Sequence, residues 1–321
     1  ERNARSMFEI GFLGTSASAP SVERGLSSLV LLYREHRFMI DCGEGTQRQL
    51  LRSGLGFRKL DKILLTHGHL DHILGLGGLI STFSRWESIS AIEIYGGAWA
   101  LQRVEDLMRV VLRGDEVDMA VSLVEVQPGP IWRDGAMTIT AIPVVHRGPG
   151  CYGYVFEEAS RRPFLAEEAE RLGVPNGPER RLLVQGQAIT LADGRVVQPE
   201  EVLGPEERGT KYVHIGDAGA TENLVEPCRN ADALVIEATY GSDEAEMAAR
   251  FGHLTATQAA DLARAANVAH LFLVHISRRH NARDLLREAR AVFPNTVVPR
   301  DLDQYRITKG AVERTARERG R

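Results

Sequence analysis

The chain has 321 residues, of which 43 % are hydrophobic, so it is long enough to bury a substantial core in one or two domains. No segment approaches the roughly 20 uninterrupted apolar residues that a membrane span needs, and the three cysteines are too few for a disulfide framework. The net charge of -4 creates no general attraction for a polyanion, which counts against nucleic-acid binding by overall charge. We therefore expect a soluble, cytoplasmic protein that has no membrane partner.

Short apolar runs bounded by turn-forming residues predict strands in the first third of the chain, at 8–13, 28–32, 38–40 and 63–65. Helical stretches are predicted at 44–53, 71–84 and 98–112, and further strands at 121–126, 136–142 and 152–156. The last third alternates strands at 233–236 and 271–274 with helices at 255–267 and 281–292, followed by short strands near 296 and 305. This mixture favours a layered α/β fold over an all-β sandwich.

Residues 157–210 interrupt the alternation, because they are rich in charges and prolines and lack a sustained apolar period. Within them, the Leu-Ala-Asp-Gly stretch at 191–194 predicts a hairpin turn. We interpret the segment as a surface insertion, and long insertions in compact folds tend to be functional. Residues 1–6 are interpreted as a tag or a disordered start. Residues 309–321 carry five basic against two acidic side chains, and we expect a basic tail in the form of a solvated terminal helix.

Three of the ten histidines lie within six residues, in the sequence His67-Gly68-His69-Leu70-Asp71-His72. They directly follow the strand-like run 62–66, so four imidazole and carboxylate groups lie on one loop where they can converge on one point. Borderline cations such as zinc favour this combination of ligands. The alternative interpretation is that the segment is only the polar start of a helix. That alternative would explain one of the four residues but not all of them.

Three further candidate ligands each follow a strand-like run: His146, Asp217 and His275. A lone histidine at such a place is usually only a hydrogen-bonded loop residue. All three residues follow a strand-like run, as the His-rich loop does. We therefore expect them to lie with that loop on a shared rim of the fold, at the ends of the strands. Five histidines and two aspartates would suit two metal ions, with one carboxylate bridging them.

The order His-x-His-x-Asp-His, then distant His, Asp and His, resembles the metallo-β-lactamase superfamily. The resemblance implies a four-layer αββα sandwich with a dinuclear metal site between its sheets. The implied ligands are His67, His69 and His146 for one metal ion, Asp71, His72 and His275 for the other, and Asp217 as the bridge.

Other segments resemble the ribonuclease Z family, which processes the 3′ ends of tRNA. They are Phe-Leu-Gly-Thr-Ser at 12–16, Asp-Cys-Gly-Glu-Gly-Thr-Gln at 41–47, Val-Pro-Asn-Gly-Pro at 174–178, Ile-Thr-Leu-Ala-Asp-Gly-Arg at 189–195, Glu-Ala-Thr at 237–239, His-Leu-Thr at 253–255 and Leu-Val-His-Ile-Ser-Arg-Arg at 273–279. The resemblance extends from about residue 8 to 308. It implies a single domain at 7–308 with a flexible arm inserted at about 157–210, and a homodimer.

The resemblance also implies an endoribonuclease that cleaves the 3′ trailer from tRNA precursors with water activated by two divalent metal ions, leaving a tRNA 3′-hydroxyl. Zinc is favoured by the His and Asp ligands, with manganese, iron and cobalt as alternatives. Asp71 is expected both to bind metal and to orient the water, and His253, oriented by Glu237, to protonate the leaving 3′-oxygen. RNA contacts are expected from Arg279 and, on the arm, from Arg180 and Arg181.

Two segments depart from the family pattern. The arm carries an overall charge that does not attract RNA, so only a local arginine patch could serve there. The early loop Pro-Ser-Val-Glu-Arg-Gly at 20–25 lacks the lysine and asparagine associated with recognition of the tRNA end, which leaves rejection of CCA-ended tRNA open. The acidic pI and this loop give some weight to an alternative, a small-molecule phosphodiesterase or sulfatase. A non-catalytic RNA-binding subunit is the alternative from another class, and it would be expected to have lost metal ligands.

Overall fold

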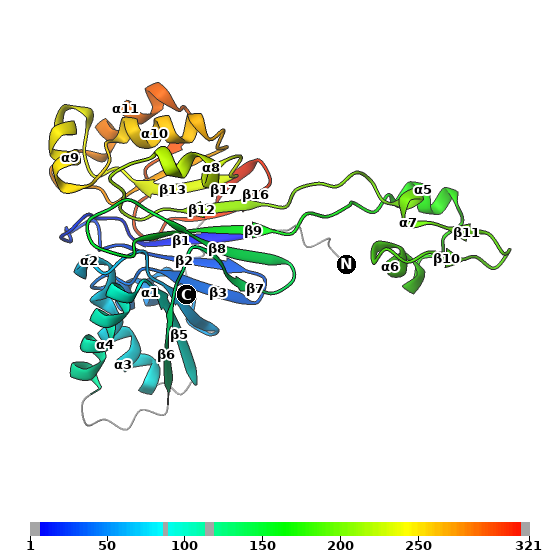
Figure 1. Cartoon of the computed structure of the whole chain (residues 1–321), viewed down its shortest axis with the longest axis horizontal. Helices are drawn as coiled ribbons and strands as arrows, with labels where there is room; N and C mark the ends of the chain where they lie inside the picture. The colour runs from blue at the N-terminus through cyan, green and yellow to red at the C-terminus, as the bar shows by residue number, and fades with distance from the viewer. Residues whose placement is uncertain (1–6, 86–88, 113–118, 316–321) are drawn as a thin grey trace. The chain divides into compact units, whose positions relative to one another are not determined.

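The computed structural model describes residues 7–85, 89–112 and 119–315, which fall into two compact units (Figure 1). The larger unit contains the chain up to Glu157 and from Thr210 onward, and the smaller unit is Glu158–Gly209. The start expected as a tag, 1–6, and the end of the basic tail, 316–321, lie outside the described residues. Within the described ranges, the structure contains no helix of the length and hydropathy that a membrane span requires.

The larger unit is built on two mixed β-sheets. Among the described residues, the first sheet has eight strands, in the spatial order β17 (Ala311–Thr315), β16 (Gln304–Thr308), β1 (Phe8–Gly14), β2 (Ser28–Tyr33), β3 (His36–Ile40), β4 (Leu60–Leu64), β5 (Ala91–Gly96) and β6 (Ala120–Glu125). The second has seven, in the order β15 (Thr296–Val297), β14 (Leu271–Val274), β13 (Ala233–Glu237), β12 (Lys211–His214), β9 (Tyr152–Glu158), β8 (Met137–Pro143) and β7 (Gly129–Arg133). Neighbouring strands run parallel from β3 to β6 and from β12 to β15, so within each set the carboxyl ends share one edge.

Alternation along the strands assigns side chains to two cores. In β13, Ala233 and Val235 contribute to the core between the sheets, whereas Leu234 and Ile236 contribute to the core under the outer helices. Because both faces are covered, the strands are nearly continuous apolar runs, which is typical of buried parallel strands.

Helices cover the outer face of each sheet (Figure 1). The helices beside the first sheet are α1 (Thr46–Ser53), α2 (Leu70–Ile73), α3 (Gly75–Arg85) and α4 (Ala98–Val111), and those on the second-sheet side are α8 (Val225–Cys228), α9 (Ala245–Phe251), α10 (Ala256–Ala265) and α11 (Ala282–Val292), with the short 3-10 turns η1 (Glu222–Leu224) and η2 (Ser242–Glu244). Apolar side chains of α1, α3 and α4 form one outer core, and those of α10 and α11 form the other. The predicted four-layer αββα sandwich is confirmed.

Two predictions of local structure were wrong. The helix expected at 71–84 is two helices, α2 and α3, and at the start of the second a Cβ on Gly75 would lie 2.0 Å from the carbonyl oxygen of Gly43. The helix expected after residue 309 is instead strand β17, which follows a turn at Gly310 (φ 73°) and pairs antiparallel with β16. Pairing with the edge of the sheet satisfies the backbone, so tertiary context overrides the polar, helix-like composition.

The smaller unit has its own small apolar core. It contains α5 (Ala166–Arg171), α6 (Pro178–Val184), β10 (Ile189–Thr190), β11 (Val196–Val197) and α7 (Pro199–Val202). Strands β10 and β11 pair antiparallel across the hairpin turn predicted at 191–194. Side chains from both helices and strands, among them Ala169, Leu183 and Ile189, are buried against one another.

Candidate metal centre

Each candidate ligand lies beyond the carboxyl end of a strand. The His67–His72 loop follows β4, His146 follows β8, Asp217 follows β12 and His275 directly follows β14. The fold brings these distant segments together, since His275 Nε2 lies 3.3 Å from Asp71 Oδ2 although 204 positions separate them in sequence.

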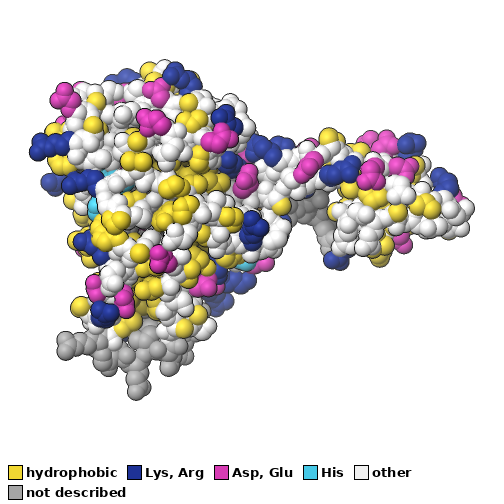
Figure 2. Space-filling view, viewed as in Figure 1, with side chains coloured by type: hydrophobic (Ala, Val, Ile, Leu, Met, Phe, Trp, Pro, Cys, Tyr) yellow, Lys and Arg dark blue, Asp and Glu magenta, His cyan; other side chains and the backbone are white. Residues whose placement is uncertain are grey.

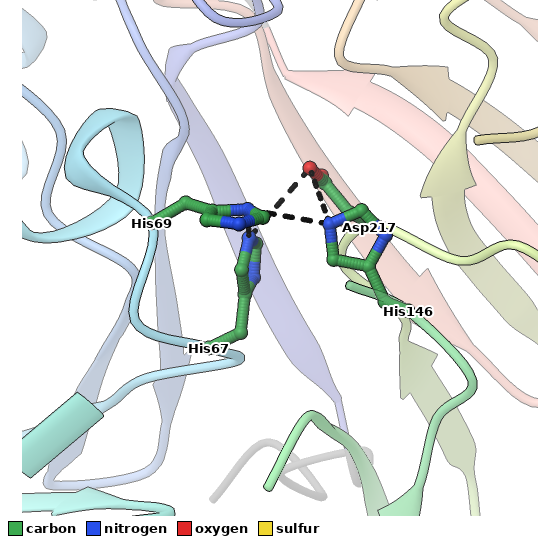
Figure 3. A group of neighbouring side chains, drawn as sticks. All are labelled: His67, His69, His146 and Asp217. Atoms are coloured by element: carbon green, nitrogen blue, oxygen red, sulfur yellow. Dashed lines mark hydrogen bonds and ion pairs between the residues drawn. The ribbon is translucent and has the colours of Figure 1, made fainter. Parts of the chain in front are cut away.

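The first group consists of His67, His69, His146 and one oxygen of Asp217 (Figure 3). The Nε2 atom of His67 lies 2.9 Å from the Nδ1 atom of His69, which lies 3.3 Å from the Nε2 atom of His146. The Oδ2 atom of Asp217 lies 3.7 Å from His67 Nε2 and 3.6 Å from His146 Nε2. Three imidazole nitrogens and one carboxylate oxygen therefore surround a single point.

The second group uses the other oxygen of Asp217. Its Oδ1 atom lies 3.4 Å from the Nε2 atoms of both His72 and His275. The Oδ2 atom of Asp71 lies 3.7 Å from His72 Nε2 and 3.3 Å from His275 Nε2. One carboxylate thus faces two ligand groups, one with each oxygen.

Both groups fit a divalent cation. Four tetrahedral ligands at about 2.0 to 2.1 Å from a zinc ion are about 3.3 Å from one another, and the spacings above scatter around that value. The Nε2 atom of His72 and the Oδ1 atom of Asp217 are buried without a hydrogen-bond partner among the described residues. Buried polar atoms are seldom left in this state, and a cation would satisfy both of them.

The ionisation of the groups also suits cation binding. Burial is the main cause that lowers the pKa of His69 to about 4 and the pKa of His67 well below its usual value. Burial opposes ionisation of Asp217, but the neighbouring imidazoles of His275 and His72 hold the pKa of its carboxyl well below the usual range. Neutral imidazoles and ionised carboxylates are the forms that bind metals, which suits His67, His69 and Asp217. Burial would lower the pKa of His72, but the charges of Asp217 and Asp41 raise it well above the usual value, so this imidazole would release a proton on binding a cation.

Three of the candidate ligand histidines are oriented by contacts of their other ring nitrogen, Nδ1, which is not the atom that faces the ligand groups. The Nδ1 atom of His72 lies 2.7 Å from Asp41 Oδ2, and that of His146 lies 2.7 Å from the carbonyl oxygen of Gly252. The Nδ1 atom of His275 lies 2.9 Å from the hydroxyl of Thr239. Such partners fix the ring orientation of metal-binding histidines.

Asp41, Thr66 and Thr239 are functional candidates whose roles were not predicted from the sequence, although Asp41 and Thr239 lie in the family motifs at 41–47 and 237–239. The Thr66 hydroxyl donates to Asp41 Oδ2 (2.7 Å) and lies 3.0 Å from His67 Nδ1, so these residues connect two histidines of different groups. Asp41 has a φ of 57°, which is rare for a residue other than glycine. The sequence signal for Asp41 is its place in the family motif at 41–47, where it follows a strand in the same way as the candidate ligands do.

Glu237 and His253, the predicted acid pair, lie beside the two candidate metal groups. The ligand atoms of His253, Asp217 and His275 are themselves close enough together to hold a cation. The Nδ1 atom of His253 lies 2.9 Å from Glu237 Oε1 and 3.9 Å from Asp217 Oδ2. Glu237 is completely buried, and its carboxylate also accepts the backbone N–H groups of Ala218 and Leu254. Burial would lower the pKa of His253, but the charge of Glu237 and its hydrogen bond outweigh burial and raise the pKa to about 9.

The predicted catalytic Asp71 is held at the mouth of the second group. Its Oδ2 atom accepts the backbone N–H of Ser18 at 2.9 Å. Burial alone would raise the pKa of this carboxyl, but a hydrogen bond from His275 and the charge of His72 lower it. Asp71 is therefore ionised near neutral pH.

The three predicted RNA-binding arginines lie outside the cluster of ligands. Arg279 pairs with Glu244 at 2.6 Å, at the surface of the larger unit. In the smaller unit, Arg180 Nη2 lies 3.7 Å from Glu170, and the guanidinium lies 5.7 Å from the ring of Phe164, whereas Arg181 is exposed. Arg180 thus makes its contacts largely within its own unit.

The metal groups are open to solvent on one side. A depression of about 520 Å³ is lined by His69, Asp71, Asp217 and His253, together with side chains around them. In Figure 2, histidine side chains reach the surface at the left edge of the larger unit, beside several Lys and Arg side chains. A polyanionic substrate would thus find cationic side chains at the entrance to the site.

Comparison with known proteins identifies the family. Residues 36–205 and 202–276 match the family model described as the Beta-lactamase superfamily domain. A curated ribonuclease Z from Bradyrhizobium diazoefficiens is 45 % identical over 297 residues, covering 92 % of this chain and 99 % of that protein. The chain belongs to the ribonuclease Z family. The resemblance inferred from the sequence motifs is therefore confirmed.

Relatives from distant organisms carry the same family name. The ribonuclease Z of Listeria innocua is 40 % identical over 306 residues, covering 93 % of this chain and 99 % of the relative. That of Archaeoglobus fulgidus is 37 % identical over 308 residues, covering 94 % and 98 %. The human short-form tRNase Z has a similar crystal structure, with a TM-score of 0.64 and 25 % identity over 92 % of this chain and 98 % of that one. The Bacillus subtilis protein YhfI, with a TM-score of 0.66 and 18 % identity over 97 % and 100 %, shares the fold.

Proposed function

We propose that the chain is a metal-dependent endoribonuclease that removes the 3′ trailer from tRNA precursors and leaves a tRNA 3′-hydroxyl. Membership of the ribonuclease Z family supports the reaction. The observation that carries the mechanism is the position of Asp217, which faces one ligand group with each carboxylate oxygen and lies 3.9 Å from His253.

We assign two divalent cations to the two groups, with zinc the best match to the imidazole and carboxylate donors. His67, His69 and His146 would hold one ion, Asp71, His72 and His275 the other, and Asp217 would bridge. When bound, such ions lower the pKa of water to near neutrality and neutralise negative charge on a phosphodiester oxygen. Manganese, iron and cobalt are the alternatives that metal analysis of the purified chain would distinguish.

Two side chains at the metal groups perform the remaining steps of hydrolysis, one orienting the water and one donating a proton. Ionised Asp71, at the mouth of the site, is placed to orient the attacking water. Protonated His253, held by Glu237 at 2.9 Å, is placed to donate a proton to the leaving 3′-oxygen. The donation matters because a ribose alkoxide is a poor leaving group unless it is protonated as the bond breaks.

The same proposal covers how the chain binds tRNA, where it works and how it assembles. Residues 158–209 act as an arm that grips the tRNA away from the scissile bond, with Arg181 as the available contact and Arg180 mainly holding the fold of the arm. Arg279 contacts a phosphate after exchanging its partner Glu244. The enzyme works in the cytoplasm as a homodimer, and the loop at 20–25 leaves open whether CCA-ended tRNA is rejected.

The test compares two substrates with the same purified protein. A tRNA precursor should be cut to a tRNA with a 3′-hydroxyl and a trailer with a 5′-phosphate, and an aryl phosphodiester should be hydrolysed as well. Turnover of the aryl phosphodiester alone would contradict the proposal and favour a small-molecule phosphodiesterase. Binding of the precursor without cleavage by the metal-loaded protein would favour an RNA-binding subunit.

A further inference from the structure

An aromatic ring and a cation lie together at one side of the depression that leads to the metal groups. Arg147 and Phe251 both line it, as do His69 and His253 on the ligand side. The guanidinium carbon of Arg147 lies 6.0 Å from the centre of the Phe251 ring. Neither residue belongs to the ligand set or to the proposed acid pair.

The backbone fixes this pair between a metal ligand and the proposed proton donor. Arg147 directly follows His146, and Phe251 precedes His253 by two residues. Between them, the carbonyl oxygen of Gly252 lies 2.7 Å from the Nδ1 atom of His146. Gly252 has a φ of 71°, and a Cβ there would lie 3.0 Å from the Cγ atom of Arg147, so the close approach requires glycine.

Both side chains are available to a ligand. Phe251 is 37 % exposed although it is large and apolar, and Arg147 is exposed. Within the described ranges, the guanidinium of Arg147 forms no ion pair, in contrast to Arg279 with Glu244. An exposed ring beside a cation that has no acidic partner is the combination that binds a single-stranded nucleotide, by stacking on its base and by contact with its phosphate.

We propose that Arg147 and Phe251 are positioning residues that hold the nucleotide whose 3′-oxygen leaves, Phe251 by stacking on its base and Arg147 by binding its phosphate. The proposal rests on the proposed function, because the position of His253 identifies the leaving-group side of the site. Since every base has a stacking face, the pair would fix the position of this nucleotide without selecting its identity.

The first test measures binding of the uncleavable product, a tRNA that ends at the cleavage site in a 3′-hydroxyl, by fluorescence anisotropy. The same RNA is also made with an abasic last nucleotide. Phe251→Leu, which keeps apolar volume but removes the aromatic face, should weaken binding of the complete RNA roughly tenfold, within the range of one base–aromatic stack. Phe251→Tyr should restore it, and Phe251→Leu should not change binding of the abasic RNA.

The second test uses a matched pair of arginines. Arg250 also lies over the Phe251 ring, at 5.7 Å, but it does not line the depression. Arg147→Gln should weaken binding and lower the slope of log affinity against log salt by about 1, as loss of one phosphate contact does. Arg250→Gln should leave that slope unchanged. Cleavage assays on the precursor should show the loss for Arg147→Gln mainly in KM.

Product binding is independent of turnover, so the two proposals fail separately. A wild-type protein that does not cut the precursor would contradict the proposed function, while product binding would still report on the pair. Equal losses for Phe251→Leu and Phe251→Tyr, a loss on abasic RNA, or equal salt slopes for the two arginine variants would overturn the role of the pair. Thermal unfolding and metal content should stay at wild-type values in all four variants.

Discussion

At the scale of single residues, the site depends on groups that never touch the reacting atoms. Asp41 is buried and fixes His72 from behind, while Thr66 joins Asp41 to His67. Without these contacts, the rings of His67 and His72 would have fewer partners to hold their orientation. The precision of the site therefore lies as much in these hydrogen bonds as in the ligands themselves.

Asp41→Asn tests this support. The amide would still fill the space, but it would lose the negative charge that accepts a hydrogen bond from His72, so we expect metal affinity to fall by about 10- to 100-fold. The measurement is competition between the protein and a chelator of known affinity. Unchanged affinity would show that Asp41 is only a structural residue.

His69→Ala removes a proposed ligand rather than the support of one. We expect loss of one metal group and of hydrolysis on every substrate, with little loss of fold because His69 lies at the open side of the site. Metal content and circular dichroism measure the two effects. Metal content and activity near wild-type levels would contradict the ligand assignment.

His253→Ala should lower turnover of tRNA precursors by at least roughly 100-fold, the lower end of general acid catalysis. An aryl phosphodiester should lose much less, because its leaving group is stable without a proton. Metal content should stay constant, since His253 is outside the proposed ligand set. An equal loss on both substrates, or loss of a metal ion, would show that His253 has another role.

Glu237→Gln gives a pH test of the same pair. In the native protein, burial lowers the pKa of His253, but Glu237 outweighs it and keeps the imidazole protonated up to about pH 9. Without the carboxylate charge, the proton is lost at lower pH. The alkaline limb of the pH profile for precursor cleavage should therefore move to lower pH. An alkaline limb at the wild-type pH would show that Glu237 does not set the pKa of the catalytic acid.

At the scale of elements, the strand ends could be predicted because each ligand follows an apolar run bounded by turn residues. Other features depend on tertiary context. The charged residues of β17 gave no strand signal, and only the exposed edge of β16 explains their pairing. Asp41 lies in the family motif at 41–47, but its partner His72 lies 31 positions away, so only the fold could reveal the contact.

The smaller unit provides a test at this scale. Its apolar core contains only residues of Glu158–Gly209, so deletion of residues 160–205 with a Gly-Ser closure should leave the larger unit folded. Hydrolysis of an aryl phosphodiester should remain largely intact, whereas binding of a tRNA precursor should weaken severely. Equal losses on both substrates would show that the segment is part of the catalytic core.

At the scale of the whole molecule, the sandwich brings loops from both sheets to one edge, where the two oxygens of Asp217 face two groups of candidate ligands. Each sheet supplies part of the set, β4 the His67–His72 loop and β12 and β14 Asp217 and His275. The site therefore exists only when the two halves are packed together. This dependence explains why motifs far apart in sequence act as one centre.

The most direct test of the account is a titration of the metal-stripped chain with Zn²⁺ while release of the 3′ trailer from a tRNA precursor is followed. We predict no release without metal, a rise that reaches its plateau at two equivalents per chain, and a tRNA product with a 3′-hydroxyl. Release that persists after metal removal, or a plateau at one equivalent, would contradict a mechanism built on two ligand groups bridged by Asp217.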